Sequence, residues 1–411
     1  MSAARSIAVL ADYAEENWTS MDLVATMLVD EVSKKRESGV AVARICPPFR
    51  RHFGRLGDRS RTLINADRVL NRLGHYPRYL RRIRDGFDRF HIADHSYAGL
   101  VHYLPRERTG VFCHDLDLFR CLISPEPTPR PFWFRAMARR VLSGLQSASV
   151  VFYSTGAVRR EIERHGLVDS ARLVQAPFGI CPEFAPGPAT PDPAAGIVAR
   201  LGGAPFLLNV GSALPRKRLD VLLEVFAHVL RRVPELRLVQ VGATWTEAHR
   251  ALIARLGIGQ HVMQLRGIER PVLASLYRRA AVVLMTTEAE GFGLPLIEAL
   301  ACGSTVVASD LVVLREVGAD AALYRPAGDV EAWTDTVEGV LLGTVQVPSR
   351  AQRLHGAERY SWSRHADTIL GAYGLTPSIR MAPAQQHSWR TRTNGAVAGY
   401  QQLPRAQREG A

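Results

Sequence analysis

The most informative pattern for the fold is AVVLMTTEAEGFGLPLIEALACG (residues 281–303). Its first seven residues form an apolar run that is typical of a buried strand, and LIEALACG is typical of a helix. Between them, Gly291 and Gly293 let the backbone approach a ligand closely. Pro295 suits the first turn of a helix, because it has no N–H to leave unpaired. This order predicts a strand–loop–helix unit of an α/β fold.

Two glutamates frame this loop. Glu290 lies in the loop and Glu298 in the first helical turn, so both are able to face one pocket. The free N–H groups at a helix start bind anions such as a diphosphate, and a carboxylate accepts two hydrogen bonds from a sugar or ribose diol. In the alternative, both carboxylates only favour the helix dipole, which contributes about 0.3–1 kcal/mol each.

A second motif, NVGSALPRKRLD (209–220), leaves an apolar run and enters a helical pattern. Gly211 permits a tight turn there. Arg216 and Lys217 place two cations side by side in the loop, as the neutralisation of a diphosphate leaving group requires. Lys217 is one of only three lysines among 52 basic residues. The alternative is a solvated basic loop.

Outward from these motifs, strand and helix patterns alternate along the chain, which predicts parallel sheets. A helix is expected from Ser20, with Ser20 as its cap. The proline-rich stretch 185–196 predicts a linker, so we expect two α/β domains of similar size. The strands are expected at 6–13, 90–94, 108–115, 148–154, 205–212, 236–242, 262–267, 281–287, 304–309 and 321–325.

Composition narrows the class of protein. The chain has 411 residues, 47% hydrophobic and 22% charged, which excludes disorder throughout. No apolar stretch reaches the roughly 18 residues of a membrane-spanning helix, and the N-terminus does not read as a secretory signal. Five cysteines without a CxxC pair argue against a disulfide framework or zinc site. We expect a reduced, cytoplasmic protein.

The net charge is +13, so nucleic acid, anionic membrane and phosphorylated ligands are candidate partners. Residues 50–89 hold twelve arginines against four aspartates. This block is a solvated face, a surface for anionic lipid headgroups, or a nucleic-acid surface; no zinc finger or RNP motif supports the last. The aromatic residues that would anchor it in a lipid interface are Phe49, Phe53, Tyr76, Tyr79, Phe87 and Phe90.

The two motifs resemble the donor-binding half of retaining glycosyltransferases of family 4. LRLVQVG (236–242), RGIERPVLASLYRRA (266–280) and EALACGSTVVASD (298–310) extend the likeness over residues 205–310. YSWSRHADTILGAY (360–373) resembles the family's last helix, which crosses back onto the first domain. The resemblance implies the GT-B fold, with two Rossmann-like domains facing an interdomain cleft.

This resemblance implies a domain layout. Residues 1–184 would form the acceptor-binding domain, 197–355 the nucleotide-sugar domain and 356–375 the returning helix. The stretch 185–196 would be the linker between them. The polar, Arg-rich tail 376–411 is expected to be disordered.

The resemblance also implies roles for individual residues. Glu298 would hold the ribose hydroxyls, Glu290 the transferred sugar, and Arg216 with Lys217 the diphosphate. The remaining donor-binding positions are Gly211 and Ser212 at the phosphate turn, Phe292, Gly293 and Leu294 in the loop whose backbone binds sugar or phosphate, and Arg266, Gly267 and Ile268 around the base.

In the first half, His114 follows a strand, where the family often has a histidine near the donor sugar and the acceptor. His114 therefore joins Glu290, Arg216 and Lys217 as a candidate catalytic residue; otherwise it is a structural histidine. Asp115 either orients it or caps the next segment. The loop DYAEENWTSMD (12–22) lacks the glycine of the family, and there Glu15, Glu16 and Trp18 either bind the acceptor or form a surface loop.

The expected reaction moves a sugar from a UDP- or GDP-linked donor to a hydroxyl of a carbohydrate, lipid-linked or small-molecule acceptor, with retention of the anomeric configuration. No cofactor and no metal are expected, because no DxD motif ends a donor-half strand and Arg216, Lys217 and the helix N-terminus take the place of Mg²⁺. We expect a cytoplasmic enzyme, which is peripheral on the inner membrane face if the 50–89 block binds lipid and free of the membrane if that block is a solvated face. An epimerase or hydrolase, a non-catalytic nucleotide-sugar binder and a nucleic-acid-binding protein are the alternatives.

Overall fold

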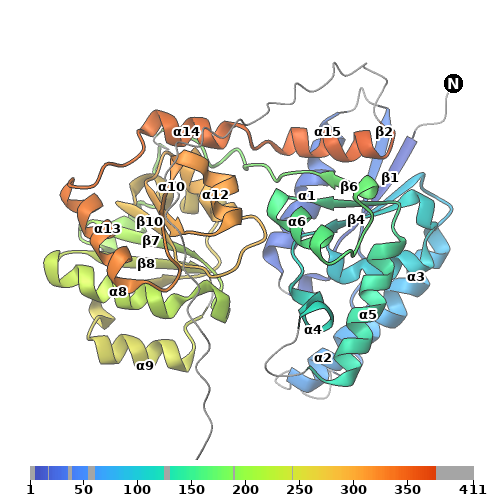
Figure 1. Cartoon of the computed structure of the whole chain (residues 1–411), viewed down its shortest axis with the longest axis horizontal. Helices are drawn as coiled ribbons and strands as arrows, with labels where there is room; N and C mark the ends of the chain where they lie inside the picture. Colours follow the sequence, from blue (N-terminus) through green and yellow to red (C-terminus); the bar gives the residue numbers. More distant parts are fainter. Residues whose placement is uncertain are drawn as a thin grey trace, which may run out of the picture. The chain divides into compact units, whose positions relative to one another are not determined.

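The computed structural model describes residues 5–16, 18–35, 39–53, 61–124, 130–187, 190–242 and 244–375. Within them lie two six-stranded parallel sheets with helices packed on them, which confirms the two α/β units expected from the sequence (Figure 1). The predicted disordered tail, 376–411, lies outside the described residues.

The first sheet has the order β2-β1-β3-β4-β5-β6. Its strands are β1 (Arg5–Leu10), β2 (Val40–Ile45), β3 (Arg89–Ile92), β4 (Thr109–Cys113), β5 (Val150–Tyr153) and β6 (Leu173–Gln175). Its longer helical elements are α1 (Thr19–Lys34), α2 (Arg61–Leu70), η4 (Asn71–His75), α3 (Tyr76–Ile83), η5 (His95–Tyr103), α4 (Arg120–Ile123), α5 (Phe132–Ser147) and α6 (Gly156–Arg164).

The two edge strands of this sheet, β2 and β6, were not predicted. Only the end residues Val40 and Ile45 of β2 are buried, and no residue of β6 is. Edge strands bury fewer side chains, so their apolar signal is weaker. The predicted helix cap at Ser20 was also wrong, because α1 begins at Thr19 after Trp18, and no side chain caps it.

The second sheet has the order β12-β11-β10-β7-β8-β9, and all six of its strands were predicted. They are β7 (Phe206–Gly211), β8 (Arg237–Gly242), β9 (Val262–Leu265), β10 (Val282–Met285), β11 (Val306–Ser309) and β12 (Leu323–Arg325). The helices are α8 (Leu219–Arg232), α9 (Glu247–Leu256), α10 (Arg270–Arg279), α11 (Leu294–Ala301), α12 (Val312–Gly318), α13 (Val330–Leu342) and α14 (Arg350–Glu358).

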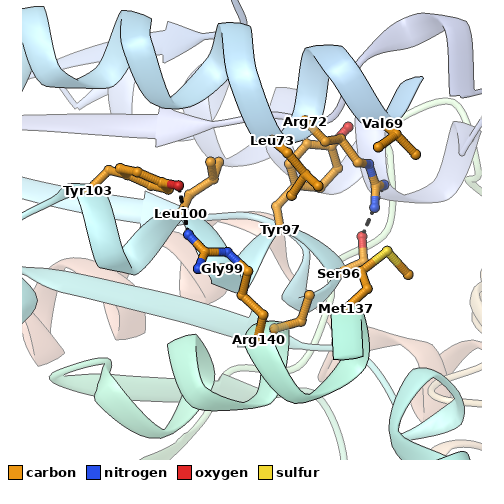
Figure 2. Close-up of a pocket in the computed structure, with 11 residues that line it drawn as sticks. Val69, Arg72, Leu73, Ser96, Tyr97, Gly99, Leu100, Tyr103, Met137 and Arg140 are labelled. Carbon is orange, nitrogen blue, oxygen red and sulfur yellow. Dashed lines mark hydrogen bonds between the residues drawn. The ribbon is translucent and has the colours of Figure 1, made fainter. Parts of the chain in front are cut away.

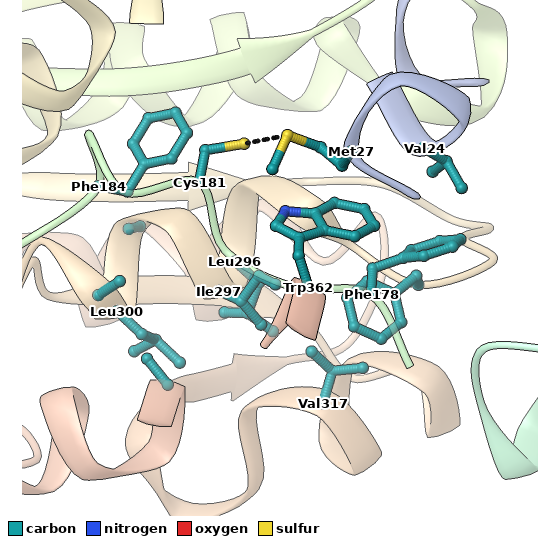
Figure 3. Close-up of a cluster of buried hydrophobic side chains, with 14 of the residues drawn as sticks. Val24, Met27, Phe178, Cys181, Phe184, Leu296, Ile297, Leu300, Val317 and Trp362 are labelled. Carbon is teal, nitrogen blue, oxygen red and sulfur yellow. Dashed lines mark hydrogen bonds between the residues drawn. The ribbon is translucent and has the colours of Figure 1, made fainter. Parts of the chain in front are cut away.

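The last helix, α15 (Trp362–Ala372), returns to the first sheet as predicted. Lys35 at the end of α1 pairs with Asp367, and the Tyr373 hydroxyl donates to the Phe90 carbonyl at 3.1 Å. Buried Trp362 packs near Phe178, with ring centroids 5.9 Å apart. Figure 3 shows the apolar cluster around it, with side chains from α1, α11, α12 and the loop after β6.

The proline-rich stretch is attached to α10 at Ala185 and at Asp192. Arg278 Nη1 donates to the Ala185 carbonyl at 3.2 Å. Asp192 accepts from the Ser275 hydroxyl at 2.5 Å and pairs with Arg279 at 2.8 Å. The domain boundaries at 185–196 stay a prediction. Among the described residues, no helix has the length and apolar character needed to cross a membrane.

Candidate functional site

The glycine loop between β10 and α11 is the centre of the site. Gly293 is the N-cap of α11 and has φ +95°, a conformation that favours glycine. A Cβ on Gly291 would overlap the carbonyl oxygen of His114. The carbonyl of Gly291 accepts from the hydroxyls of Ser154 and Thr155, both at 3.3 Å. Both glycines are therefore required, one for the turn and one for close packing against the loops after β4 and β5.

The basic turn after β7 is held in place by the chain that follows β10. Glu288 N–H and the Thr287 hydroxyl donate to the Arg216 carbonyl at 2.8 and 3.0 Å, and the Thr286 hydroxyl donates to the Lys217 carbonyl at 3.1 Å. These contacts fix the direction in which the two cations leave the turn. Thr286 and Thr287 were predicted as the last two residues of a strand (281–287), but β10 ends at Met285, and both side chains instead bind the basic turn.

In the structure, Arg216 and Lys217 lie close to Glu290. Lys217 forms an ion pair with Glu290, whose side chain is 8% exposed. Arg216 Nη1 lies 3.8 Å from the other oxygen of Glu290 and donates to the Ala289 carbonyl at 2.7 Å. Arg216 Nε is also 3.9 Å from Asp117. Two cations and one carboxylate therefore form a partly buried cluster at the edge where β7 and β10 end.

Glu298 is buried and lies on the second turn of α11. Its predicted place in the first helical turn was wrong, because the helix begins only at Leu294. The Tyr277 hydroxyl donates to its Oε2 at 3.1 Å. Burial raises the pKa of Glu298 to about 7, and the hydrogen bond from Tyr277 and the charge of Arg270 only partly oppose this. Glu298 is therefore a titrating group near neutral pH, a property that the sequence did not indicate.

The phosphate-turn residues lie at the end of β7. Gly211 is its last residue, and the Gln240 amide donates to the Gly211 carbonyl at 2.9 Å. A Cβ on Gly242, which ends β8, would overlap that carbonyl. Ser212 follows directly. The two strand ends are therefore packed backbone to backbone.

Other predicted donor-binding positions divide between loop and core. Arg266 follows β9 and donates to the Thr244 hydroxyl at 2.7 Å, and Gly267 has φ +60°. Ile268 packs partly into the core and Leu294 begins α11. The Phe292 side chain is buried against Phe178 and Tyr360, with centroids 5.0 and 5.4 Å away. Phe292 therefore has only its backbone left for a ligand, as the resemblance implies.

His114 follows β4 and is buried. Its Nε2 lies 2.7 Å from the Ala93 carbonyl and donates to it, which leaves Nδ1 as an acceptor. Nδ1 is buried and has no partner in the described part of the chain. Burial lowers the pKa of His114, so the ring is neutral. The side chain therefore offers one acceptor atom and no spare proton.

Two buried aspartates that the sequence analysis missed lie on the neighbouring strands. Asp12 stands two residues after β1 and Asp94 two residues after β3, and their carboxyl groups share a hydrogen bond. Burial, and then the charge of Asp94, raise the pKa of Asp12. Asp94 accepts from both Ser96 N–H (2.9 Å) and its hydroxyl (2.5 Å), whereas Asp12 Oδ2 is buried without a partner.

The glycine-free first loop is tied down by an ion pair. Glu16 is buried and accepts from Arg72 Nε at 2.7 Å, and the guanidinium of Arg72 lies 4.0 Å from the Tyr97 ring centroid. Glu15 and Trp18 are exposed. Glu16 is thus a buried structural partner of Arg72 and not part of a plain surface loop.

A largely apolar pocket adjoins this ion pair, between η4, η5 and α5 (Figure 2). Val69, Leu73 and Met137 line it, and Figure 2 shows Arg72 bonded to Ser96 at one end. Arg140 donates to the Tyr103 hydroxyl at 2.6 Å at the other end.

The predicted lipid anchors of the 50–89 block are only partly exposed. Tyr76 on α3 and Phe90 on β3 are fully buried, so their interpretation as surface anchors was wrong. Both side chains belong to one hydrophobic core of the first half. Phe53 and Tyr79 are exposed, and Phe49 and Phe87 are half-buried. The helix α5 adds two exposed aromatic residues that the sequence analysis did not include, Phe132 at 84% and Trp133 at 57%.

Comparison with known proteins identifies relatives of this chain. Residues 197–354 match the family described as glycosyl transferases group 1. The D-inositol 3-phosphate glycosyltransferase of Stackebrandtia nassauensis is 30% identical over 315 residues, 70% of this chain and 68% of that protein. Its counterpart from Kribbella flavida is 34% identical over 181 residues, which span 41% of this chain and 42% of that protein.

The fold is likewise similar to that of solved structures. Anabaena HepE in complex with UDP and glucose aligns with a TM-score of 0.68 at 16% identity, covering 90% of this chain and 99% of that one. At this identity the similarity concerns the fold.

The raised pKa of Glu298 makes a prediction about stability. Because its value in the folded protein, about 7, exceeds the ordinary 4.5, the neutral carboxyl contributes stability that is fully present below about pH 4.5 and is lost as the pH rises through 7. The Glu298→Gln variant stays neutral throughout. Relative to the wild type, its free energy of unfolding should therefore rise by about 3 kcal/mol between pH 4 and pH 8.

Urea unfolding at a series of pH values measures this difference. Glu247→Gln, on the exposed first turn of α9, is the matched control and should not reproduce the trend. A difference between Glu298→Gln and wild type that stays constant with pH would contradict the assignment.

Proposed function

This chain belongs to the glycosyl transferases of group 1, a family of retaining enzymes that transfer a sugar from a nucleotide-sugar, and we propose which of its residues carry out that transfer. The observation that carries the proposal is the cluster of Arg216, Lys217 and Glu290 where β7 and β10 end. Ligands of parallel α/β sheets bind at the carboxyl ends of the strands, and this cluster lies at two of them.

Arg216 and Lys217 bind the diphosphate of the donor. When the bond between the sugar C1 and the diphosphate oxygen breaks, negative charge builds on the leaving group, and fixed cations stabilise it. The N–H groups at the start of α11 add to this field. Before the donor binds, Lys217 is paired with the Glu290 carboxylate. When the donor binds, the diphosphate replaces this carboxylate as its anionic partner, so the charge of Lys217 is neutralised in both states.

Glu290 positions the transferred sugar by accepting hydrogen bonds from its hydroxyls. Glu298, on the second turn of α11, accepts from the ribose. Retention is consistent with attack of the acceptor hydroxyl on the face from which the diphosphate leaves. The new bond joins the acceptor oxygen to C1, and the hydroxyl proton passes to the leaving diphosphate. The arrangement is proposed to work without a metal.

The acceptor lies over the ends of β1, β3 and β4. There, Asp12 Oδ2 and His114 Nδ1 are buried hydrogen-bond acceptors without partners among the described residues. Leaving buried polar atoms unpaired costs about 1–3 kcal/mol each, and the hydroxyl groups of an acceptor would satisfy both. The negative charge of Asp94 beside Asp12 favours a neutral, hydroxyl-rich group at this point over a phosphate.

The donor base is proposed to be uracil or guanine. Anabaena HepE was solved with UDP and glucose, which supports testing UDP-linked donors first. A nucleotide-sugar hydrolase is the second candidate, and the assay below separates it, because a hydrolase releases free sugar whether or not an acceptor is present.

Lys217→Ala should lower turnover about 10²-fold or more, because it removes a cation from the leaving group. The measurement is UDP or GDP release from UDP-glucose or GDP-mannose in EDTA, with carbohydrate acceptors supplied. Lys34→Ala is the matched control, since Lys34 is an exposed lysine at the end of α1. A near-normal rate for Lys217→Ala would contradict its role at the leaving group and make it a lysine of a solvated loop.

Asp12→Asn should slow sugar transfer about 10-fold or more, while the affinity for UDP or GDP changes less than about twofold. The asparagine keeps the size of the side chain but replaces one of its two oxygens with an amide NH₂, which cannot accept a hydrogen bond. Transfer rate and calorimetric affinity are measured on the same preparation. Unchanged transfer with the best acceptor in the panel would remove Asp12 from the acceptor site.

An anionic membrane is a proposed second partner. Exposed Arg78, Arg81 and Arg82 on and beside α3 lie in the same half of the chain as exposed Phe132 and Trp133 on α5, and cations combined with aromatic anchors suit a lipid interface.

Co-sedimentation with vesicles rich in phosphatidylglycerol should therefore fall at least severalfold when these three arginines become glutamine. Vesicles of phosphatidylcholine alone give the uncharged reference. The matched control replaces three exposed arginines of the other half of the chain, Arg231 and Arg232 on α8 and Arg255 on α9. Equal co-sedimentation of all variants would make the 50–89 block a solvated face.

A further inference from the structure

Glu298 is a buried carboxyl group with one fixed partner. Its Oε2 accepts from the Tyr277 hydroxyl at 3.1 Å, and no lysine or arginine forms an ion pair with it in the described part of the chain. Buried carboxylates are usually paired with a cation or with several donors. The single phenol leaves this group short of the donors that an ionised carboxylate requires.

The other ionisable groups around Glu298 do not supply that charge. Arg270, on the first turn of α10, acts on it only through space. Cys302 at the end of α11 and Cys181 in the loop after β6 are thiols within its field, and burial raises the pKa of both. Neither thiol carries a charge near neutral pH, so Tyr277 is the group that decides how Glu298 is held.

Tyr277 is itself rigidly placed. It is fully buried on α10, its carbonyl accepts from the Ser304 hydroxyl at 2.7 Å, and its ring lies 5.8 Å from that of Phe184. Its hydroxyl therefore has a fixed position, and with it Oε2 of Glu298. The second carboxylate oxygen is left for a ligand.

We propose that Tyr277 is a positioning residue for Glu298, and that through this pair the binding of a nucleoside diphosphate releases a proton from the enzyme. The inference rests on the proposed role of Glu298 in holding the ribose. Hydroxyl groups that donate to a carboxylate favour its ionised form. The ribose diol supplies the donors that the protein itself does not provide, so a neutral Glu298 gives up its proton when the diol binds.

Calorimetric titration of the whole chain with UDP and with GDP at pH 7.0, in two buffers of different ionisation enthalpy, counts the protons released. Glu298→Gln is the matched control, because it corrects for protons that the nucleotide phosphate itself loses. The wild type should release about half a proton more than the variant at pH 7.0, and the excess should vanish near pH 9.

Tyr277→Phe keeps the ring and removes only the hydroxyl. Without this donor the carboxylate is less favoured, so the pH at which affinity is half lost should move upward by about one unit. The affinity should fall about tenfold at pH 6.5 and approach that of the wild type at pH 9. If Glu298→Gln binds nucleotide too weakly to be titrated, the pH dependence of the Tyr277→Phe affinity tests the proposal by itself.

Equal proton release by wild type and Glu298→Gln would overturn the inference, and so would a Tyr277→Phe affinity lowered by one constant factor at every pH, which marks a purely structural tyrosine. Both results leave the transferase assignment intact. Failure of the wild type to bind either nucleotide would instead overturn the proposed donor site, and the inference with it.

Discussion

The ion pair between Lys217 and Glu290 joins two loops that lie 73 residues apart in the sequence. Its formation depends on the order of the second sheet, in which β10 lies directly beside β7. Parallel pairing of these strands brings their carboxyl ends to one edge, and Thr286 and Thr287 then fix the basic turn against β10. The donor site is a consequence of that strand order.

The two sheets present opposite chemistry at their carboxyl edges. The first offers Asp12, Asp94 and neutral His114, which accept hydrogen bonds; the second offers Arg216 and Lys217. Acceptor hydroxyls and a diphosphate leaving group have the matching properties. The packing of the glycine loop against the His114 backbone brings the two edges into contact, which explains why Gly291 admits no side chain.

The sequence allowed the second half to be predicted well because its strands are short apolar runs bounded by glycine loops, and all six were found. The edge strands β2 and β6 were not predicted, because they bury few side chains and so show little apolar pattern. The motif pattern predicted that Glu290 and Lys217 share a site. It did not predict the Asp12–Asp94 pair, since only the strand order brings residues 82 positions apart together. A usable signal existed, because each acid is a charged residue near the end of an apolar strand pattern, in SIAVLADY (6–13) and in FHIAD (90–94).

The central claim is that the cluster of Arg216, Lys217 and Glu290 receives the donor diphosphate. A crystal structure of the chain with UDP or GDP bound tests it most directly. We expect phosphate oxygens within hydrogen-bonding distance of both Lys217 Nζ and the Arg216 guanidinium, with the ribose on Glu298. A bound nucleotide whose phosphates lie elsewhere, with Lys217 still paired only to Glu290, would contradict it.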